Sequence, residues 1–232
     1  MVNGTEQVND VLTFMIGSYG LVRNAPHLLV GILPTDDDRA RIDLGFVLEH
    51  VVLEATRLGL GTCWITGTYD PREAGDVVGL EPGEDAAAVC TLGHPAEEGY
   101  GRFHTRTIRR LAGGHRRKPL PDIVFDERWN EPWAPEEADP DLVSVMEHAR
   151  LAPSARNAQP WRFIVEADRI TLAVVERRFI DAGIVMSHVS LASAAVACDG
   201  RWTIRLRDRS LARELGIPDS ATTIATFDLA KG

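Results

Sequence analysis

The stretch APSARNAQPWRF occupies residues 152–163 and gives the strongest indication of the fold. Pro153 ends the helix predicted before it, because proline has no N–H and clashes with the preceding turn. Ser154 and Asn157 favour an Asx- or Ser-type turn that leaves backbone N–H groups available, and Pro160 sets an extended start to the next strand. Such a turn can bind the edge of a planar heterocycle through hydrogen bonds. A simple helix-to-strand loop, whose polar side chains satisfy their own backbone, fits the residues equally well.

Outward from this turn, helical and extended patterns alternate without a regular strand–helix–strand rhythm. Apolar residues recur at helical spacing between Asp43 and Leu58, and Gly59 follows as a natural helix end. The irregular order predicts an α+β fold with antiparallel sheets. The predicted helices cover residues 43–58, 141–150, 181–198 and 210–215, the last capped by Ser210. The predicted strands cover residues 27–33, 86–92, 162–166, 169–175, 201–207 and 222–229.

The segment 119–140 differs in composition from the rest of the chain. It carries five prolines among acidic residues and two tryptophans. Proline at that density fixes φ and removes N–H donors, so we expect an extended connector here rather than a helix or a central strand.

The chain also carries an internal repeat at a separation of 138 residues (181 − 43). The matched pairs include polar residues and glycines: Asp43 and Asp181, Gly45 and Gly183, His50 and His188, Trp64 and Trp202. Two amphipathic helices can share residues by chance, but the polar matches favour a repeated unit. We therefore predict two halves, residues 1–118 and 141–232, packed about a pseudo-two-fold axis like a homodimer with joined subunits. The two histidines are better explained as hydrogen-bonded structural residues than as catalytic ones.

A second motif, LGLGTCWITG, spans residues 58–67. Gly59 and Gly61 let the chain leave a helix tightly and come close to a ligand. The motif follows a helix instead of opening one, so it is no dinucleotide fingerprint. Taken alone, its glycines fit a helix C-cap better than a cofactor site, and Trp64 fits a core position better than a stacking one.

Composition excludes several classes of function. The net charge of −9 and pI of about 5.3 argue against nucleic acid as a partner, because phosphate neutralisation needs a basic face. No apolar run approaches the roughly 20 residues that span a bilayer, and the N-terminus does not resemble a secretory signal. Three widely separated cysteines indicate neither a disulfide framework nor a zinc site. We expect a cytoplasmic protein without a bound metal.

Four stretches of the chain together resemble the FMN-dependent nitroreductase family. Residues 152–163 look like its flavin-binding loop, and residues 43–67 are similar to its interface helix and the loop beyond it. Gly93-His94-Pro95 and residues 115–119 resemble its last strand end and its basic tail. Because the tail precedes the flavin loop here, the order resembles the smaller branch of the family with an internal duplication.

The resemblance implies one FMN site per chain, to which both halves contribute. In the family, the flavin lies between two subunits, one giving the flavin loop and the other the loop after the interface helix. Carried over to this sequence, the second half would contribute Pro153, Ser154, Ala155 and Asn157. The first half would contribute Thr62, Cys63, Trp64 and Ile65.

The chain departs from the family where the FMN phosphate is held. Family members carry an Arg-Arg-Ser-x-Arg motif near the N-terminus, which this sequence lacks. Arg116 and Arg117, with Lys118, can compensate, because guanidinium forks suit phosphate; a solvated basic turn fits them equally well. Arg156 or Arg162 could supply positive charge near the N1–C2=O end of the flavin, and both fit surface positions as well.

The resemblance implies NAD(P)H-dependent reduction of a small acceptor, such as a nitroaromatic, a quinone or another metabolite. NAD(P)H would pass hydride to N5 of FMN and leave before the acceptor binds, and no side chain is required as a catalytic acid or base. The alternative is a flavin-free binding or scaffold protein that keeps the fold. The joined halves make a monomer sufficient, and a homodimer stays open.

Overall fold

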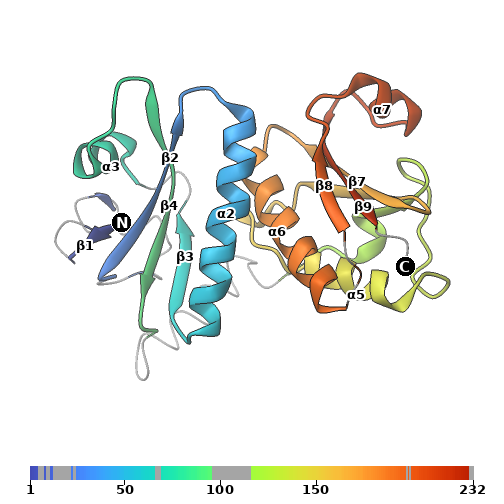
Figure 1. Cartoon of the computed structure of the whole chain (residues 1–232), viewed down its shortest axis with the longest axis horizontal. Helices are drawn as coiled ribbons and strands as arrows, with labels where there is room; N and C mark the ends of the chain where they lie inside the picture. The colour runs from blue at the N-terminus through green and yellow to red at the C-terminus, as the bar shows by residue number, and fades with distance from the viewer. Residues whose placement is uncertain are drawn as a thin grey trace. The chain divides into compact units, whose positions relative to one another are not determined.

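The computed structural model describes residues 1–4, 8, 11–12, 22, 25–65, 69–95, 116–196, 198 and 200–229 (Figure 1). It divides into two compact units, one of Met1–Leu44 with Leu48–Arg116 and the other of Gly45–Val47 with Arg117–Gly232. Helices stand beside antiparallel sheets in both, which confirms the predicted α+β class. Gly67 and His115, which belong to two of the sequence motifs, lie outside the described residues.

The first unit is built on a four-stranded antiparallel sheet in the order β1-β2-β4-β3. Its strands are β1 (Val2–Asn3), β2 (His27–Pro34), β3 (Gly61–Ile65) and β4 (Glu84–Gly93), and its helices are α2 (Asp38–Arg57) and α3 (Pro71–Val78). Helix α2 begins five residues before the predicted Asp43, because Asp37 caps it by accepting a hydrogen bond from the Ala40 N–H. Gly59, at φ 77°, follows its C-terminal end as predicted.

The second unit is built on a five-stranded sheet in the order β5-β6-β7-β9-β8. Its strands are β5 (Val124–Asp126), β6 (Trp161–Val165), β7 (Arg169–Val175), β8 (Gly200–Ile204) and β9 (Ala221–Leu229). Its helices are α5 (Pro140–Ala149), α6 (Phe179–Ala195) and α7 (Arg209–Glu214), with short 3₁₀ turns η1 (Leu120–Asp122) and η2 (Ala155–Asn157). All neighbouring strands are antiparallel except β5 and β6, and α6 packs between α5 and the sheet.

Both units connect their elements in the same order. The first runs β2-α2-β3-α3-β4 with sheet order β2-β4-β3, and the second runs β7-α6-β8-α7-β9 with sheet order β7-β9-β8. A register shift interrupts β2 on β4 between Gly31 and Ile32, and β7 on β9 between Leu172 and Ala173. This shared topology fits the internal repeat in the sequence; its origin by duplication stays a prediction.

Several further details differ from the sequence-based predictions. The helix predicted over residues 181–198 is α6, and the strand predicted over residues 201–207 is β8 and ends at Ile204. The segment 119–140 includes an edge strand, β5, so it contributes to the core of the second unit. Five of its side chains are buried: Leu120, Ile123, Val124, Phe125 and Trp133. Helix α7 is capped by Asp208, which accepts hydrogen bonds from the N–H groups of Ser210 and Leu211, and not by Ser210. Asp208 lies one residue before the helix, where its carboxylate can reach those amides.

Within the part of the chain that the structure describes, no helix is long and apolar enough to cross a membrane. The same residues hold no group of three or more His, Cys, Asp or Glu side chains that could bind a metal ion. Cys63, Cys90 and Cys198 form no disulfide.

Candidate functional site

The loop between α5 and β6 has an unusual backbone. Arg156, Asn157 and Gln159 have φ angles of 55°, 53° and 47°, in the left-handed region. Asparagine tolerates that region, but arginine and glutamine rarely adopt it, and each such residue costs of order 1 kcal/mol or more. This conformation persists only where surrounding contacts hold it, so the contacts of the loop determine its backbone conformation.

The loop is first held by bonds within itself. The Ser154 hydroxyl accepts a hydrogen bond from the Gln159 N–H at 2.9 Å, and the Ser154 carbonyl accepts from the Asn157 N–H at 2.9 Å. The Ala158 N–H donates to the Ala155 carbonyl at 3.1 Å. The sequence predicts a turn with available N–H groups. The structure instead uses these three amides to close the turn, which makes it rigid.

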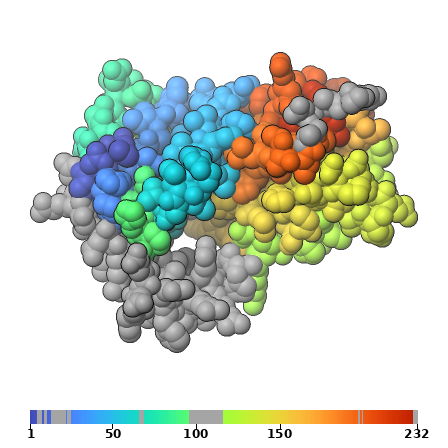
Figure 2. All heavy atoms as spheres, turned by 60° about the horizontal axis from the view of Figure 1, so that its bottom comes forward, coloured from blue at the N-terminus to red at the C-terminus, as the bar shows by residue number. Residues whose placement is uncertain are grey.

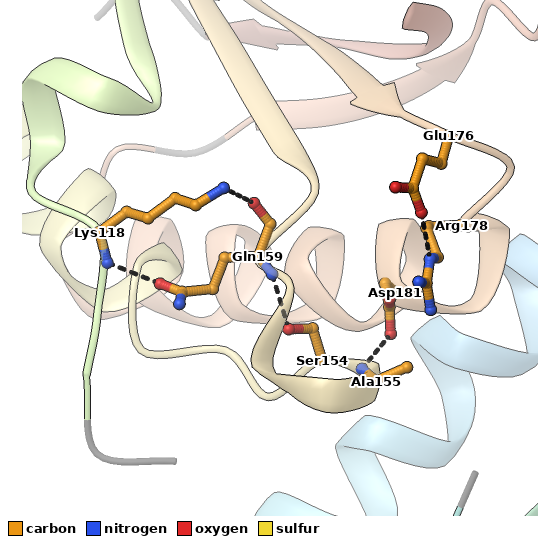
Figure 3. A network of polar contacts seen from close by, with 7 residues as sticks. All are labelled: Lys118, Ser154, Ala155, Gln159, Glu176, Arg178 and Asp181. Atoms are coloured by element: carbon orange, nitrogen blue, oxygen red, sulfur yellow. Dashed lines mark hydrogen bonds and ion pairs between the residues drawn. The ribbon is translucent and has the colours of Figure 1, made fainter. Parts of the chain in front are cut away.

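Two consecutive basic residues, Arg117 and Lys118, hold the loop from outside. The Arg117 guanidinium donates to the Asn157 side-chain oxygen at 2.6 Å and to the Leu151 carbonyl at 3.1 Å. The Lys118 N–H donates to the Gln159 side-chain oxygen at 2.7 Å, and its ammonium donates to the Gln159 carbonyl at 3.2 Å (Figure 3). Segments 40 residues apart in the sequence are thus joined into one site.

Helix α6 holds the loop at its other end. The Ala155 N–H donates to Oδ1 of Asp181, in the first turn of α6, at 3.0 Å (Figure 3). Asp181 is only 4% exposed, and burial raises the pKa of its carboxyl, although the Ala155 bond and the charge of Arg178 act in the opposite direction. Arg178 itself pairs with Glu176 at 3.0 Å.

The loop lies among half-buried cations. Burial lowers the pKa of the Lys118 ammonium, and the nearby Arg162 guanidinium lowers it further. Burial also lowers the pKa of Arg162, which donates to the carbonyls of Trp161 at 2.6 Å and Gln159 at 3.3 Å. Asp122 opposes both shifts. Positive charges that are partly removed from water favour an anionic ligand nearby.

The site is accessible from solvent. Arg156 is exposed, Pro153, Ser154, Ala155 and Asn157 are half-buried, and Leu151 is 52% exposed. Figure 2 shows the yellow atoms of α5 and the segment after it at the surface of the second unit. A ligand can therefore reach this loop without opening the core.

The predicted residues of the first unit lie on β3, the edge strand of its sheet. Thr62, Cys63 and Trp64 are half-buried, and the Trp64 indole N–H donates to the buried Glu49 carboxylate at 2.7 Å. Trp64 packs beside Leu48, Val52 and Cys90, in agreement with the core position that the sequence favours for it. Ile65 is 3% exposed and belongs to the core, so it offers a ligand its backbone only.

Within the second unit, the structure places Arg117 against the loop that contains Ser154, Ala155 and Asn157; their role in binding FMN stays a prediction. Arg116 is exposed, and His50 and His188 are half-buried on α2 and α6. Sequence reasoning missed the supporting role of Asp181, which the internal repeat singled out only as a matched polar position.

Comparison with solved structures places this architecture in a known class. One match is a "putative nitroreductase" from Thermotoga maritima, with a TM-score of 0.54 and 21% identity over 84% of this chain and 67% of that one. Another is a "putative nitroreductase" from Anabaena variabilis, with a TM-score of 0.54 and 12% identity over 84% of this chain and 65% of that one. The protein therefore has the nitroreductase fold.

Family comparison is more specific. The family model described as "Putative TM nitroreductase" matches residues 7–193, so the chain belongs to this family. Comparison with curated proteins found no match.

Proposed function

We propose that this protein is an FMN-dependent NAD(P)H oxidoreductase of the nitroreductase family. The observation that carries the proposal is the loop of Ser154–Gln159, in which Arg156, Asn157 and Gln159 are left-handed. Arg117 and Lys118 donate hydrogen bonds to this loop, and Asp181 accepts one from it. Strained, over-determined backbone is typical of ligand sites.

The residues present fit a flavin phosphate or another anionic part of the cofactor. Lys118 and Arg162 are cations whose pKa values burial lowers, and a bound anion would offset that cost. Lys118 and Arg162 are the proposed replacement for the absent N-terminal arginine motif, whereas Arg117 orders the loop through its bonds to Asn157 and Leu151. The predicted contribution of Thr62–Ile65 to FMN binding rests on the family resemblance alone.

When bound, FMN supplies the N5 position through which hydride passes from NAD(P)H to a small oxidised acceptor in two half-reactions. The chain supplies binding and orientation. Ser154 and Asn157 keep the loop rigid, and the cations beside it stabilise negative charge. Since no proton transfer by a side chain is required, we assign no catalytic residue. Nitroaromatics and quinones are the acceptor classes to test first.

The first experiment is the visible absorbance spectrum of the purified protein, before and after titration with FMN. We expect flavin bands that bleach when NADH or NADPH is added without oxygen. A folded sample that shows neither bound flavin nor saturable FMN binding would instead support a binding or scaffold protein that keeps only the fold.

A pair of variants tests the site itself. Asn157→Gly keeps the left-handed backbone, which glycine tolerates, but removes the oxygen that accepts from Arg117. A lost bond to a charged group corresponds to roughly a tenfold or larger rise in the Kd for FMN. Asn130→Gly is the matched control, because Asn130 is also left-handed, at φ 64°, and lies exposed outside the loop. Equal FMN affinity for both variants would place the site elsewhere.

A further inference from the structure

Asp181 is a buried carboxyl whose hydrogen bonding is incomplete. Its Oδ1 accepts from the Ala155 N–H at 3.0 Å, as Figure 3 shows, and its side chain is almost fully removed from solvent. The second oxygen, Oδ2, is buried without a hydrogen-bond partner among the described residues. A buried polar oxygen without a hydrogen-bond partner destabilises the folded state, so burial of this carboxyl has an energetic cost to the fold.

Asp181 lies in the first turn of α6, where negative charge suits the helix N-terminus. It is not the N-cap, since that position belongs to Arg178, and the residues after it, Ala182, Gly183 and Ile184, are buried. The hydrogen bond that the structure gives the Asp181 side chain runs to a loop 26 residues earlier in the chain.

The position of that bond within the loop is informative. Ala155 is the first residue of η2, and Ser154 before it is extended, at φ −149° and ψ 156°. The left-handed residues Arg156 and Asn157 follow at once. An acceptor on a rigid helix therefore determines where the chain leaves the extended conformation and enters the strained turn.

We propose that Asp181 is a positioning residue for the cofactor loop: it accepts from the Ala155 amide and thereby holds Ser154–Asn157 in the conformation that binds FMN. It touches neither cofactor nor substrate. The inference rests on the proposed function, but its structural half, the ordering of the loop, can be measured without any flavin.

Three variants separate the acceptor from the charge. Asp181→Asn keeps an oxygen that can accept from Ala155 and removes the charge, whereas Asp181→Leu removes the acceptor at similar volume. Ala155→Pro removes the donor instead, and the extended Ser154 before it already has the conformation that a following proline requires. This variant keeps the proposal testable if Asp181→Leu fails to fold. The matched controls are Asp43→Asn and Asp43→Leu, because Asp43 is the repeat partner of Asp181 and pairs at the surface with Arg39.

The first readout is FMN binding, with the shape of the visible circular dichroism of the bound flavin. We expect Asp181→Leu and Ala155→Pro to raise the Kd for FMN by roughly tenfold or more and to change the visible dichroism. Asp181→Asn should restore both to within about threefold of the wild type, and the Asp43 variants should match the wild type.

The second readout is trypsin cleavage after Arg156 in the flavin-free protein. Arg156 is exposed, and an ordered turn resists the protease, so Asp181→Leu and Ala155→Pro should be cut faster than the wild type and Asp181→Asn. If the wild type binds no FMN but this cleavage pattern holds, the proposed function fails and the ordering role stands. A folded Asp181→Leu or Ala155→Pro that matches the wild type in cleavage overturns the inference, and so does one that matches it in FMN affinity when the wild type binds FMN. Loss of FMN by Asp181→Asn to the same extent as Asp181→Leu also overturns it.

Discussion

Replacement of Arg117 by glutamine removes a side chain that bonds at two points to the loop between α5 and β6. Its guanidinium donates to the Asn157 side chain at 2.6 Å and to the Leu151 carbonyl at 3.1 Å, so one group joins the start of the loop to its centre. Glutamine is shorter and uncharged and cannot make both bonds. The nearby Arg162 and Lys118 bond to the end of the loop instead, so they do not replace it.

The size of the effect follows from these two bonds. A hydrogen bond to a charged group contributes about 1.5–3 kcal/mol. Arg117 is half-buried, and water competes for such donors, so the lower end of the range applies and the pair contributes about 3 kcal/mol in total. If this free energy keeps the loop in its binding conformation, its loss raises the Kd for FMN by up to about 140-fold.

The assay compares FMN with riboflavin, which lacks the phosphate. Both ligands are titrated into the wild type and Arg117→Gln, with flavin fluorescence as the signal. A residue that orders the loop weakens both ligands by the same factor. A residue that binds phosphate weakens FMN alone and makes FMN binding more sensitive to salt. Arg213→Gln, at an exposed position on α7, is the control and should change either affinity by less than about threefold.

Two results would refute the reasoning. Wild-type affinity for both ligands in a folded Arg117→Gln would show that the loop does not depend on this guanidinium. A loss for FMN without any loss for riboflavin would show that Arg117 acts on the phosphate and not on the loop. In both cases the hydrogen bonds to Asn157 and Leu151 would not be the source of affinity.

Three further predictions concern stability and reactivity. Burial raises the pKa of the Asp181 carboxyl in the folded state above its ordinary 3.8, so the folded state binds a proton more tightly than the unfolded state does. The stability of the wild type relative to Asp181→Asn should therefore fall as the pH rises through and above 3.8. Denaturant unfolding at a series of pH values would contradict this if the difference in stability did not depend on pH. Burial raises the pKa of the Cys90 thiol to about 12, so a thiol reagent at pH 8 should label Cys90 only after the protein unfolds. Rapid labelling of Cys90 in the native protein, measured by mass spectrometry, would show that this thiol is not protected by burial. Asp208→Ala should lower the free energy of unfolding by about 0.5–2 kcal/mol because it removes the N-cap of α7, whereas Ser210→Ala should change it little. Equal melting temperatures for the two variants would show that Asp208 does not cap the helix.

Local pattern in the sequence was enough to predict most elements of the fold. The apolar runs at residues 27–33 and 169–175 form β2 and β7. Gly59 follows the end of α2, because its left-handed backbone suits a helix end. The start of α2 was missed because residues 38–42 are mostly charged and dilute the apolar period. The core role of residues 119–140 was missed because proline indicates an extended chain and not whether its apolar side chains are buried.

The candidate site was predictable only where it is contiguous. Ser154, Ala155 and Asn157 belong to one short motif, so a resemblance can point to them. The contacts that hold them come from Lys118 and Asp181, 41 residues before Gln159 and 26 residues after Ala155, and no local pattern encodes those contacts. The left-handed Arg156 was equally unpredictable, because arginine has no preference for that region and adopts it here under the constraint of its neighbours.

The two aspartates related by the repeat lie in different environments. Asp43 and Asp181 occupy matched positions on α2 and α6, yet the Asp43 side chain is 56% exposed and pairs with Arg39, whereas Asp181 is buried and bonds to the loop. The valines that follow show the same divergence: Val47 and Val51 are 62% and 44% exposed, and their partners Val185 and Val189 are fully buried. Because α5 packs on α6, positions that face solvent in one repeat face the core in the other. A shared residue type therefore identifies an equivalent position in the two repeats, but burial decides the role of the residue. Asp181 is buried beside the loop and accepts its hydrogen bond, whereas Asp43 pairs with Arg39 at the surface.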